Sequence, residues 1–389
     1  MRLDGVRVLD LTRYLPGPYA TQLLADAGAD VIKIEDPAGD PARHLDFAPD
    51  SADGTLFDAV NRGKRSVALD LKTEAGTAAF LALARDADVV IEGFRPGVAD
   101  RLGVGDEAVR EQVPDIVYCS LSGYGATGPY ETRAGHDLNY VAFAGLLDTN
   151  RANESEAPRV PGIQVGDMTG GLFAAFSVAG ALCSRALGNT DGEHLDIAIT
   201  DVLLSVSQSL APAAFGDDPP RPGETALAGA LPWYGVYETA DGRYVSLGAL
   251  EPVFWERFCE TVDRPDLVEA HGTEDGATRA ALREELDAIF AGRTHEEWEE
   301  LFADTDATVE PVRSLGEALS HPQTESRELV ERGPGPARVG FPARSSAPAE
   351  PGGGVPGHGE HTASVLREAG YRDGDLDRLR AVDAAVFGG

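Results

Sequence analysis

Three side chains of this sequence have the types needed to move a proton or to form a covalent intermediate. His136 follows a loop and begins a helical pattern, and an imidazole gives up or takes a proton near neutral pH. Asp167 follows Gly166 and begins a strongly apolar helical pattern, so its carboxylate could act as a base or cap the first-turn amides. Glu251 follows a predicted hairpin, and on its own it has no feature that separates it from a helix-start glutamate.

The glycines around Asp167 favour a functional interpretation of this carboxylate. Gly166, Gly170 and Gly171 permit the close approach of a ligand, and the amides at a helix start favour negative charge. These amides are reasonable donors to an oxyanion. A carboxylate placed here could remove a proton from carbon or attack a carbonyl group, and the residues alone leave both uses open.

The elements that must position these residues begin with an alternation of strands and helices. Strands are expected at 6–11, 29–34, 66–71, 89–91 and 116–122, and helices at 19–27 and 74–84. This rhythm predicts βαβ units and a parallel sheet, and so the α/β class. The Gly-x-Gly-x-x-Gly motif is missing after the first strand, which disfavours a nicotinamide-dependent dehydrogenase.

The rest of the chain predicts a buried helical pair and a separate smaller unit. Apolar helices are expected at 168–187 and 196–210, followed by a linker rich in proline and glycine at 217–231. A hairpin is predicted from 234–239 and 244–247, and helices from 253–262 and 278–302. An extended segment at 333–359 then leads to a last helix at 360–370.

The charge of the chain restricts its partners. With 33 basic and 65 acidic residues the net charge is −32, and only Lys33, Lys64 and Lys72 are lysines. A nucleic-acid partner is disfavoured because its phosphates would be repelled. We interpret the acidic surface as an adaptation to a salt-rich cytoplasm, with an ordinary acidic protein as the alternative.

The cysteines and the apolar segments indicate a cytoplasmic protein. Cys119, Cys183 and Cys259 are scattered, which disfavours a disulfide framework or a zinc site. No uninterrupted apolar run approaches the roughly 18 residues of a membrane span, and the first residues lack a signal-peptide pattern. We therefore expect no membrane partner and no metal.

Short phrases along almost the whole chain resemble those of one family. In order they are GVRVLD at 5–10, GP at 17–18, AGADVIKIE at 27–35, DLK at 70–72, EGFRPGV at 92–98, LSGYG at 121–125, GP at 128–129, GHDLNY at 135–140 and GEHT at 359–362. In this order and spacing, the chain resembles the type III CoA-transferase superfamily, called CaiB/BaiF-like, and most of all its α-methylacyl-CoA racemases.

The resemblance implies a fold and an assembly. A large CoA-binding α/β domain, 1–216 and 326–389, would contain a Rossmann-like parallel sheet built from both ends of the chain. A smaller α+β domain would comprise 225–325. Members of the family form interlocked rings of two chains, so the resemblance implies a homodimer.

The resemblance also implies roles for the three candidate residues. His136 and Asp167 would stand on opposite faces of the α-carbon of a 2-methylacyl-CoA thioester, with Glu251 as a supporting carboxylate. The transferases use the equivalent aspartate as a nucleophile and commonly lack the histidine. The leading hypothesis is therefore a racemase, the alternative is CoA transfer through an aspartyl-CoA anhydride at Asp167, and a third is CoA binding without catalysis. Gln164 departs from the pattern, because racemases usually have an asparagine shortly before the aspartate.

A further set of residues is expected to bind the CoA thioester. It comprises Arg65, Leu69, Asp70, Leu71, Lys72, Gly93, Phe94, Arg95 and Arg101, together with Gly135, Asp137, Leu138, Asn139 and Tyr140 around the histidine. For each basic member, the alternative is a solvated or ion-paired side chain. Asp36 stands where related racemases can have an arginine, so that contact with CoA is expected to be lost. No separate cofactor is expected, because CoA is part of the substrate.

Overall fold

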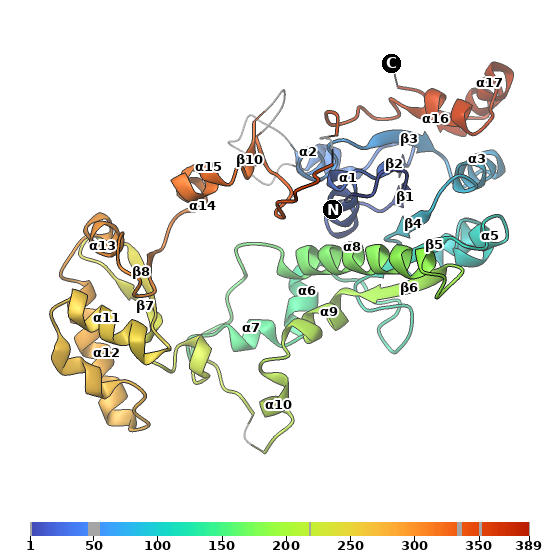
Figure 1. Cartoon of the computed structure of the whole chain (residues 1–389). Coiled ribbons are helices and arrows are strands. Elements are labelled where there is room, and N and C mark those ends of the chain that lie inside the picture. Colours follow the sequence, from blue (N-terminus) through green and yellow to red (C-terminus); the bar gives the residue numbers. More distant parts are fainter. Residues whose placement is uncertain (1, 46–54, 218, 333–336, 350–351, 389) are drawn as a thin grey trace. The chain divides into compact units, whose positions relative to one another are not determined.

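The computed structural model describes residues 2–45, 55–217, 219–332, 337–349 and 352–388. The chain divides into two compact units: unit 1 contains Met1–Ala144, Pro161–Ser207 and Ser326–Gly389, and unit 2 contains Gly145–Val160 and Gln208–Glu325. The expected division also resumed the large domain at 326. It differs from the observed one by leaving 145–160 in the large domain and by starting the small domain at 225. Figure 1 labels the elements of both units.

The sheet of unit 1 has seven strands among the described residues, in the order β12-β3-β2-β1-β4-β5-β6. All neighbours pair in parallel except β12, which runs antiparallel to β3. The α/β fold with a parallel sheet built from both ends of the chain is thereby confirmed. The strands are β1 (Arg7–Leu11), β2 (Asp30–Glu35), β3 (Arg65–Leu69), β4 (Val89–Glu92), β5 (Val117–Ser122), β6 (Glu193–Ala198) and β12 (Ala385–Val386).

Helices cover both faces of this sheet, which explains why the strands read as almost continuous apolar runs. Val8 and Leu9 are adjacent in β1 and point to opposite faces, yet both are fully buried. On one face lie α1 (Pro16–Asp26) and α8 (Val165–Ala186), which contact each other and the strands. The other face packs against α3 (Glu74–Ala84), α5 (Asp106–Arg110), α16 (Thr362–Glu368) and α17 (Asp373–Ala381).

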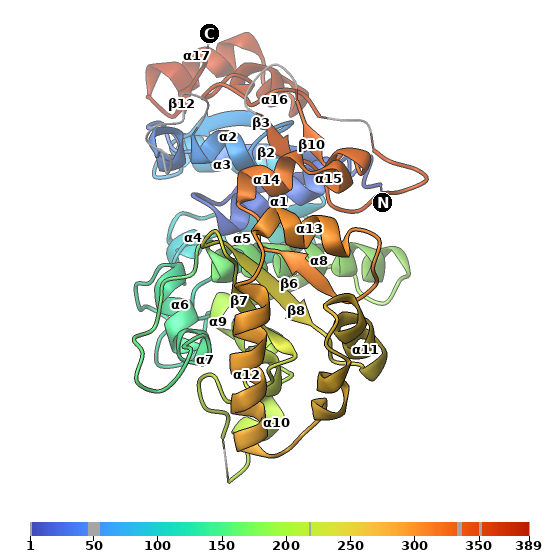
Figure 2. The same cartoon turned by 90° about the vertical axis from the view of Figure 1, so that its left-hand side faces the viewer.

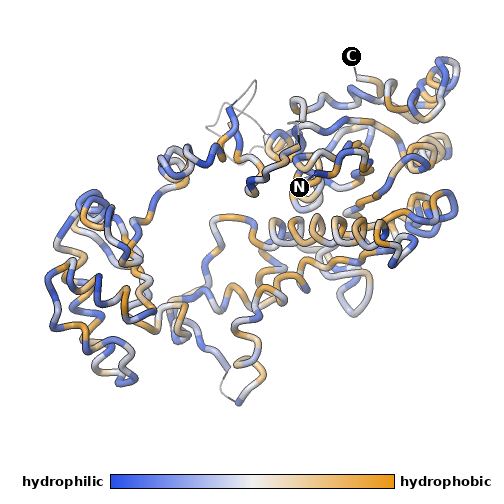
Figure 3. The backbone as a smooth tube through the Cα atoms, in the orientation of Figure 1, coloured by the Kyte–Doolittle hydropathy of each residue, from blue (hydrophilic) through white to orange (hydrophobic). Residues whose placement is uncertain are grey.

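Helix α8 packs against α1 through a glycine. A Cβ atom added to Gly171 would lie 2.3 Å from the carbonyl oxygen of Pro16, so only glycine fits this contact. By length and composition α8 could cross a membrane, and it is the one such helix among the described residues. Figure 3 shows its largely apolar character. Because α8 also contacts β5, β6 and α9 (Ile199–Val206), we assign it to the core of unit 1.

The remaining elements of unit 1 are short. They are η1 (Pro41–His44), α2 (Leu56–Val60), α4 (Val98–Arg101), α6 (Asp137–Phe143), β10 (Val330–Glu331) and β11 (Arg338–Val339). Helix α15 (Pro322–Ser326) spans the boundary between the units.

Unit 2 has its own small sheet and core. The predicted hairpin forms β7 (Tyr234–Glu238) and β8 (Tyr244–Gly248), and β9 (Val309–Pro311) pairs with β8. Figure 2 shows β7 and β8 from a second direction. Trp255, Phe258, Phe290 and Trp298 are fully buried in its core. Its helices are α7 (Leu146–Thr149), α10 (Ala211–Ala214), η2 (Ala226–Ala228), α11 (Pro252–Thr261), η3 (Pro265–Ala270), α12 (Gly276–Phe290), α13 (His295–Phe302) and α14 (Leu315–Ser320).

Two predicted helices differ from the observed elements. The helix expected at 196–210 is preceded by a strand, because 193–198 pairs with β5 before α9 begins at Ile199. The helix expected at 278–302 is two helices, since Thr294 and Glu297 form a capping box that starts α13. Helix α17 was not expected. Of the extended segment predicted at 333–359, residues 333–336 and 350–351 lie outside the described residues.

Candidate active site

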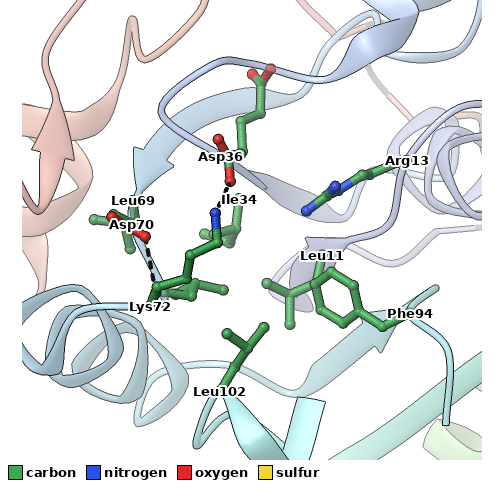
Figure 4. Close-up of a pocket in the computed structure, with 11 residues that line it drawn as sticks. Leu11, Arg13, Ile34, Asp36, Leu69, Asp70, Lys72, Phe94 and Leu102 are labelled. Carbon is green, nitrogen blue, oxygen red and sulfur yellow. Dashed lines mark hydrogen bonds and ion pairs between the residues drawn. The ribbon is translucent and has the colours of Figure 1, made fainter. Parts of the chain in front are cut away.

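A cavity lies at the carboxyl edge of the sheet in unit 1, at the point where the strand order reverses. Strand β1 lies between β2 and β4, so the connections after β1 and β4 separate at this edge, which is where open α/β sheets bind ligands. The cavity lies at the ends of β1 to β4 (Figure 4). It is lined by Leu11, Arg13, Ile34, Glu35, Asp36, Leu69, Asp70, Leu71, Lys72, Phe94 and Leu102.

This cavity combines apolar walls with two cations. Leu11 and Phe94 supply an apolar surface, and Figure 4 shows Arg13 and Lys72 reaching the cavity from different sides. The Arg13 guanidinium lies 5.5 Å from the centre of the Phe94 ring. The Nζ of Lys72 lies 3.6 Å from an Oδ of Asp36, and 74% of the Lys72 side chain is exposed. Apolar walls of this kind contact heteroaromatic rings, and cations beside them bind phosphate groups.

The structure brings part of the predicted CoA-binding set to this cavity. Leu69 to Lys72 and Phe94 line it. Gly93 is exposed beside Thr12, whereas Arg95 lines a second cavity, and Arg101 is exposed at the end of α4. None of these three lines the first cavity.

Arg65 lies at the opposite edge of the sheet. It begins β3, and its guanidinium donates to both carboxylate oxygens of Asp30 at 2.9 and 2.6 Å and to Glu368 at 2.7 Å. Arg65 is thus the ion-paired side chain that was the alternative to a CoA-binding role. Its place at the amino edge of the sheet argues against a contact with CoA.

The sequence interpretation missed Arg13. A cation that follows the first strand of a parallel sheet must lie at the carboxyl edge. The position of Arg13 in the sequence could therefore have identified it as a candidate for binding CoA.

Asp167 is positioned at the junction of α6 and α8, which contact each other. It is the third residue of α8, whereas Gln164 is the N-cap. Its own amide donates to Asp137 Oδ1 at 3.0 Å, which links the first turn of α8 to the first turn of α6. Asp167 is therefore not the N-cap residue that the sequence allowed as an alternative.

The surroundings of Asp167 favour its protonated form. Burial, and next the charge of Asp137, raise the pKa of Asp167 to about 7. Burial, and next the charge of Asp167, raise the pKa of Tyr140 to about 12. The Tyr140 hydroxyl donates to the carbonyl of Gly135 at 2.6 Å. Asp137 thus contacts the backbone of Asp167, and Tyr140 bonds to Gly135, whereas the CoA-binding role expected for these three residues stays a prediction.

His136 is the N-cap of α6 and is exposed. Its amide donates to Asn139 Oδ1 at 3.0 Å, which fixes the backbone at this helix start. Leu138 is 41% exposed on the first turn of the same helix. His136 therefore adjoins Asp137, the residue that binds the backbone of Asp167.

The expected oxyanion donors at the start of α8 are partly occupied. The amide of Asp167 donates to Asp137, and the amide of Met168 donates to the carbonyl of Gln164 at 2.9 Å. These two amides are not free to bind a substrate oxygen. The expectation for them was wrong because the helix start is joined to a neighbouring helix and already contains its first backbone hydrogen bond.

Glu251 belongs to unit 2. It is the exposed N-cap of α11, and its carbonyl accepts hydrogen bonds from the amides of Phe254 and Trp255. Its side chain makes no capping hydrogen bond. The residues of unit 1 that the structure brings together are thus Asp137, Tyr140 and Asp167, and His136 precedes Asp137 in the sequence.

Known proteins resemble this chain over almost its full length. The model of CoA-transferase family III matches residues 3–362. An acyl-CoA transferase of Fusarium pseudograminearum is 36% identical, and the match covers 95% of this chain and 85% of the relative. Mouse α-methylacyl-CoA racemase is 31% identical, with coverage of 98% and 97%. The crystal structure of a CAIB/BAIF family protein from Brucella suis has a TM-score of 0.82 and 29% identity, covering 94% of this chain and 98% of that one.

Proposed function

Because the chain belongs to CoA-transferase family III, we propose that it binds a 2-methylacyl-CoA thioester and interconverts its (R) and (S) epimers. The observation that carries this proposal is the placement of Asp167 beside Asp137 at the contact of α6 and α8, where burial and Asp137 raise its pKa to about 7. A carboxyl with such a pKa exists in both protonation states near neutral pH. Both states are needed by a group that removes a proton in one direction and returns it in the other.

The α-proton of a thioester is weakly acidic, so its removal places charge on the thioester oxygen. In one direction the carboxylate of Asp167 takes the proton from the α-carbon, and protonated His136 delivers another proton to the opposite face. In the reverse direction neutral His136 is the base and protonated Asp167 is the acid. The placement of the two residues at the starts of the contacting helices α6 and α8 supports this division of roles.

The nucleotide part of CoA is proposed to bind in the cavity at the carboxyl edge of the sheet. Phe94 and Leu11 offer an apolar surface for adenine, and Arg13 and Lys72 offer cations for phosphate groups. Binding of a phosphate would compete with the ion pair between Lys72 and Asp36. The loss of an arginine contact at Asp36 remains a prediction.

CoA transfer is the alternative function, and the similarity to the Fusarium acyl-CoA transferase favours it. In this reaction the Asp167 carboxylate attacks the thioester carbonyl, the C–S bond breaks, and CoA leaves as a thiolate. The thiolate then attacks the Asp167 carbonyl of the mixed anhydride, which releases the donor acid and leaves an aspartyl-CoA thioester. The acceptor acid attacks this thioester and releases the thiolate, and the thiolate attacks the acceptor carbonyl of the new anhydride, which gives the new CoA thioester and restores Asp167. This reaction needs the ionised form of Asp167. The ionised fraction of the carboxyl is larger at a pH above its pKa than at a pH below it.

The decisive experiment follows deuterium and CoA separately. The purified chain is incubated with (S)-2-methylacyl-CoA in deuterium oxide, without and with a free carboxylic acid. We expect deuterium at the α-carbon and loss of optical purity without the acid, measured by mass spectrometry and chiral chromatography. CoA exchange that requires the acid, without deuterium incorporation, would support the transferase instead. If neither signal appears, CoA binding without catalysis is the remaining function.

Two variants and a control assign the roles. His136→Ala should reduce epimerisation about 10²–10⁴-fold, the usual contribution of a positioned acid or base. It should leave a transferase activity nearly unchanged. Asp191→Asn removes an exposed carboxylate before β6 and should leave both activities unchanged. Full epimerisation by His136→Ala would contradict the assigned role of the histidine. The role of Glu251 is tested in the same way with Glu251→Gln.

We also propose that the chain functions as a homodimer. Leu172, Phe173 and Phe176 on α8 are 54%, 42% and 69% exposed, and exposed apolar groups of this size favour a protein partner. Light scattering coupled to size-exclusion chromatography should give twice the mass of the chain. Phe176→Glu should shift the mass to that of one chain, and a wild-type mass of one chain at micromolar concentration would contradict the proposal.

A further inference from the structure

Glu92 is a buried carboxyl to which the proposed mechanism gives no role. It ends β4 and is only 6% exposed. In the sheet it pairs with Leu11 of β1 on one side and with Ser120 of β5 on the other. Leu11 lines the cavity assigned to CoA, so Glu92 stands directly beside that site.

The carboxyl of Glu92 holds the backbone of the following loop. Its Oε2 accepts the amide of Phe94 at 2.7 Å, two residues further along the chain. This bond fixes the turn in which β4 ends and from which the Phe94 ring projects. Phe94 also packs against the core of unit 1 and lies 5.5 Å from the guanidinium of Arg13.

Phe94 separates two cavities. One is the cavity at the ends of β1 to β4, and the other has a volume of about 230 Å³ and lies toward β5 and β6. The second cavity is lined by Glu92, Tyr118, Ser120, His194 and Asp196, among others. Phe94 therefore borders open space on two sides, in addition to its contact with the core.

Polar groups from each neighbouring element face Glu92 from the second cavity. The Ser120 hydroxyl lies 3.0 Å from Nε2 of His194, whose Nδ1 is 3.9 Å from Asp106 of α5. Arg95 lines the same cavity. Burial, and also the charges of Asp100 and Asp196, raise the pKa of Glu92 to about 7, so glutamine is a close substitute for its protonated form.

We propose that Glu92 is a positioning residue for the CoA site, which holds Phe94 as the wall of the nucleotide cavity through the Phe94 amide. This inference rests on the proposed binding of CoA in that cavity. Glu92 acts on binding rather than on the reacting atoms, because it holds the loop and not the α6–α8 junction. It should therefore change the affinity for CoA and leave the rate at saturation unchanged.

The test compares two substitutions that differ in their ability to accept the amide. Glu92→Leu has a similar size but no acceptor, and it should raise the Kd for coenzyme A about tenfold or more, measured by isothermal titration calorimetry on the full chain. Glu92→Gln keeps an acceptor oxygen and should bind within about threefold of wild type. Ser120→Ala changes the side chain of the residue that pairs with Glu92 in β5 and leaves the bond to Phe94, so its Kd should match wild type.

The turnover measured with saturating substrate completes the test. It should be equal in wild type, Glu92→Gln and Glu92→Leu. A Kd unchanged in Glu92→Leu, or equally weakened in Glu92→Gln and Glu92→Leu, overturns the proposal. If Glu92→Leu does not fold by circular dichroism, Glu92→Asp gives the same test, because its shorter side chain withdraws the carboxyl from the Phe94 amide. A wild-type chain that does not bind coenzyme A would contradict the proposed function itself.

Discussion

Asp10 and Asp167 are both withdrawn from solvent in unit 1, but their neighbours drive their pKa values in opposite directions. Asp10 is fully buried at the end of β1, and its carboxylate accepts the hydroxyls of Thr12 and Thr21 at 2.5 and 2.6 Å. Burial alone would raise its pKa. The nearby charges of Lys33 and Lys64 outweigh this effect and hold the pKa of Asp10 well below its usual range.

Asp167 has no such cation among its described partners. Its charged neighbour is Asp137, so burial and a like charge act together and raise its pKa to about 7. The difference shows how one side-chain type serves two purposes. With cations beside it, a buried carboxylate joins segments of the fold, and beside another acid it remains able to exchange a proton.

The largest effect is expected from removing the unpaired carboxyl. Asp167→Asn retains the shape of the side chain and the hydrogen bond from the backbone amide of residue 167 to Asp137. The asparagine side chain cannot exchange a proton in the reaction. We expect epimerisation to fall at least about 10³-fold, while circular dichroism shows the same fold as wild type. Activity within tenfold of wild type would show that Asp167 is not the reactive group.

A large loss of stability is expected when the paired carboxylate loses a cation. The Nζ of Lys64 is fully buried and bonds to Asp10, Thr21, Asn61 and the carbonyl of Pro18. Lys64→Met should reduce the free energy of unfolding in urea by about 3–5 kcal/mol.

The exposed Lys72 provides the matched control. It forms an ion pair with Asp36 but is 74% exposed, so Lys72→Met should cost less than about 1 kcal/mol. Equal losses for the two lysine variants would contradict the distinction between a buried and an exposed pair.

The pKa shifts of Asp167 and Asp10 have opposite signs, so the two carboxyls should change the stability of the chain with pH in opposite directions. The ordinary pKa of an aspartate carboxyl is 3.8, and that of Asp167 in the folded chain is about 7, so between these values the folded state holds a proton that the unfolded state has lost. Its contribution to stability is complete below pH 4 and is lost as the pH rises through 7. The stability of wild type relative to Asp167→Asn should therefore fall by up to about 1.4 kcal/mol per pH unit in this window.

Urea midpoints of both proteins at pH 5, 6, 7 and 8 measure this difference, with Asp191→Asn as the exposed control. The stability that Asp10 contributes through its own titration should not change in this range. Because its folded pKa is depressed, that contribution is present above its unfolded pKa and lost only as the pH falls below about 4. A flat difference between wild type and Asp167→Asn would show that Asp167 is ionised in the folded chain.

The smallest effect concerns salt. The net charge of −32 should make the whole chain more stable as potassium chloride rises from 0.1 to 2 M, because screening reduces repulsion among surface carboxylates. The penalty of Lys64→Met should change by less than about 0.5 kcal/mol over this range, since buried pairs are screened little. Unfolding curves that do not depend on salt would contradict the proposed adaptation to a salt-rich cytoplasm.

The sequence predicted the elements of unit 1 well where local periodicity decides them. Helix α3 was predicted at its observed bounds, 74–84, because an amphipathic pattern between two apolar strands leaves little freedom. Strand β6 was taken for the start of a helix, since its pairing with β5 depends on residues more than 70 positions earlier, such as Ser120 opposite Asp196.

The candidate site was predicted in part for the same reason. Motif phrases located Asp167, His136 and Tyr140, but the bond from the Asp167 amide to Asp137 joins residues 30 positions apart. Arg65 was expected at the nucleotide because it is basic in an acidic chain, and its partner Asp30 is 35 positions away. Contacts at such separations depend on tertiary packing, which local patterns do not contain.

The antiparallel edge strand has a consequence for synthesis of the protein. Strand β12 at residues 385–386 covers the edge formed by β3, but it leaves the ribosome only after all of unit 2. Until then the sheet made by the earlier residues keeps an uncovered edge at β3, and open strand edges pair readily with other chains. A nascent chain must therefore keep this edge from pairing with its neighbours while more than 300 residues are still being added, from Leu69 to Ala385.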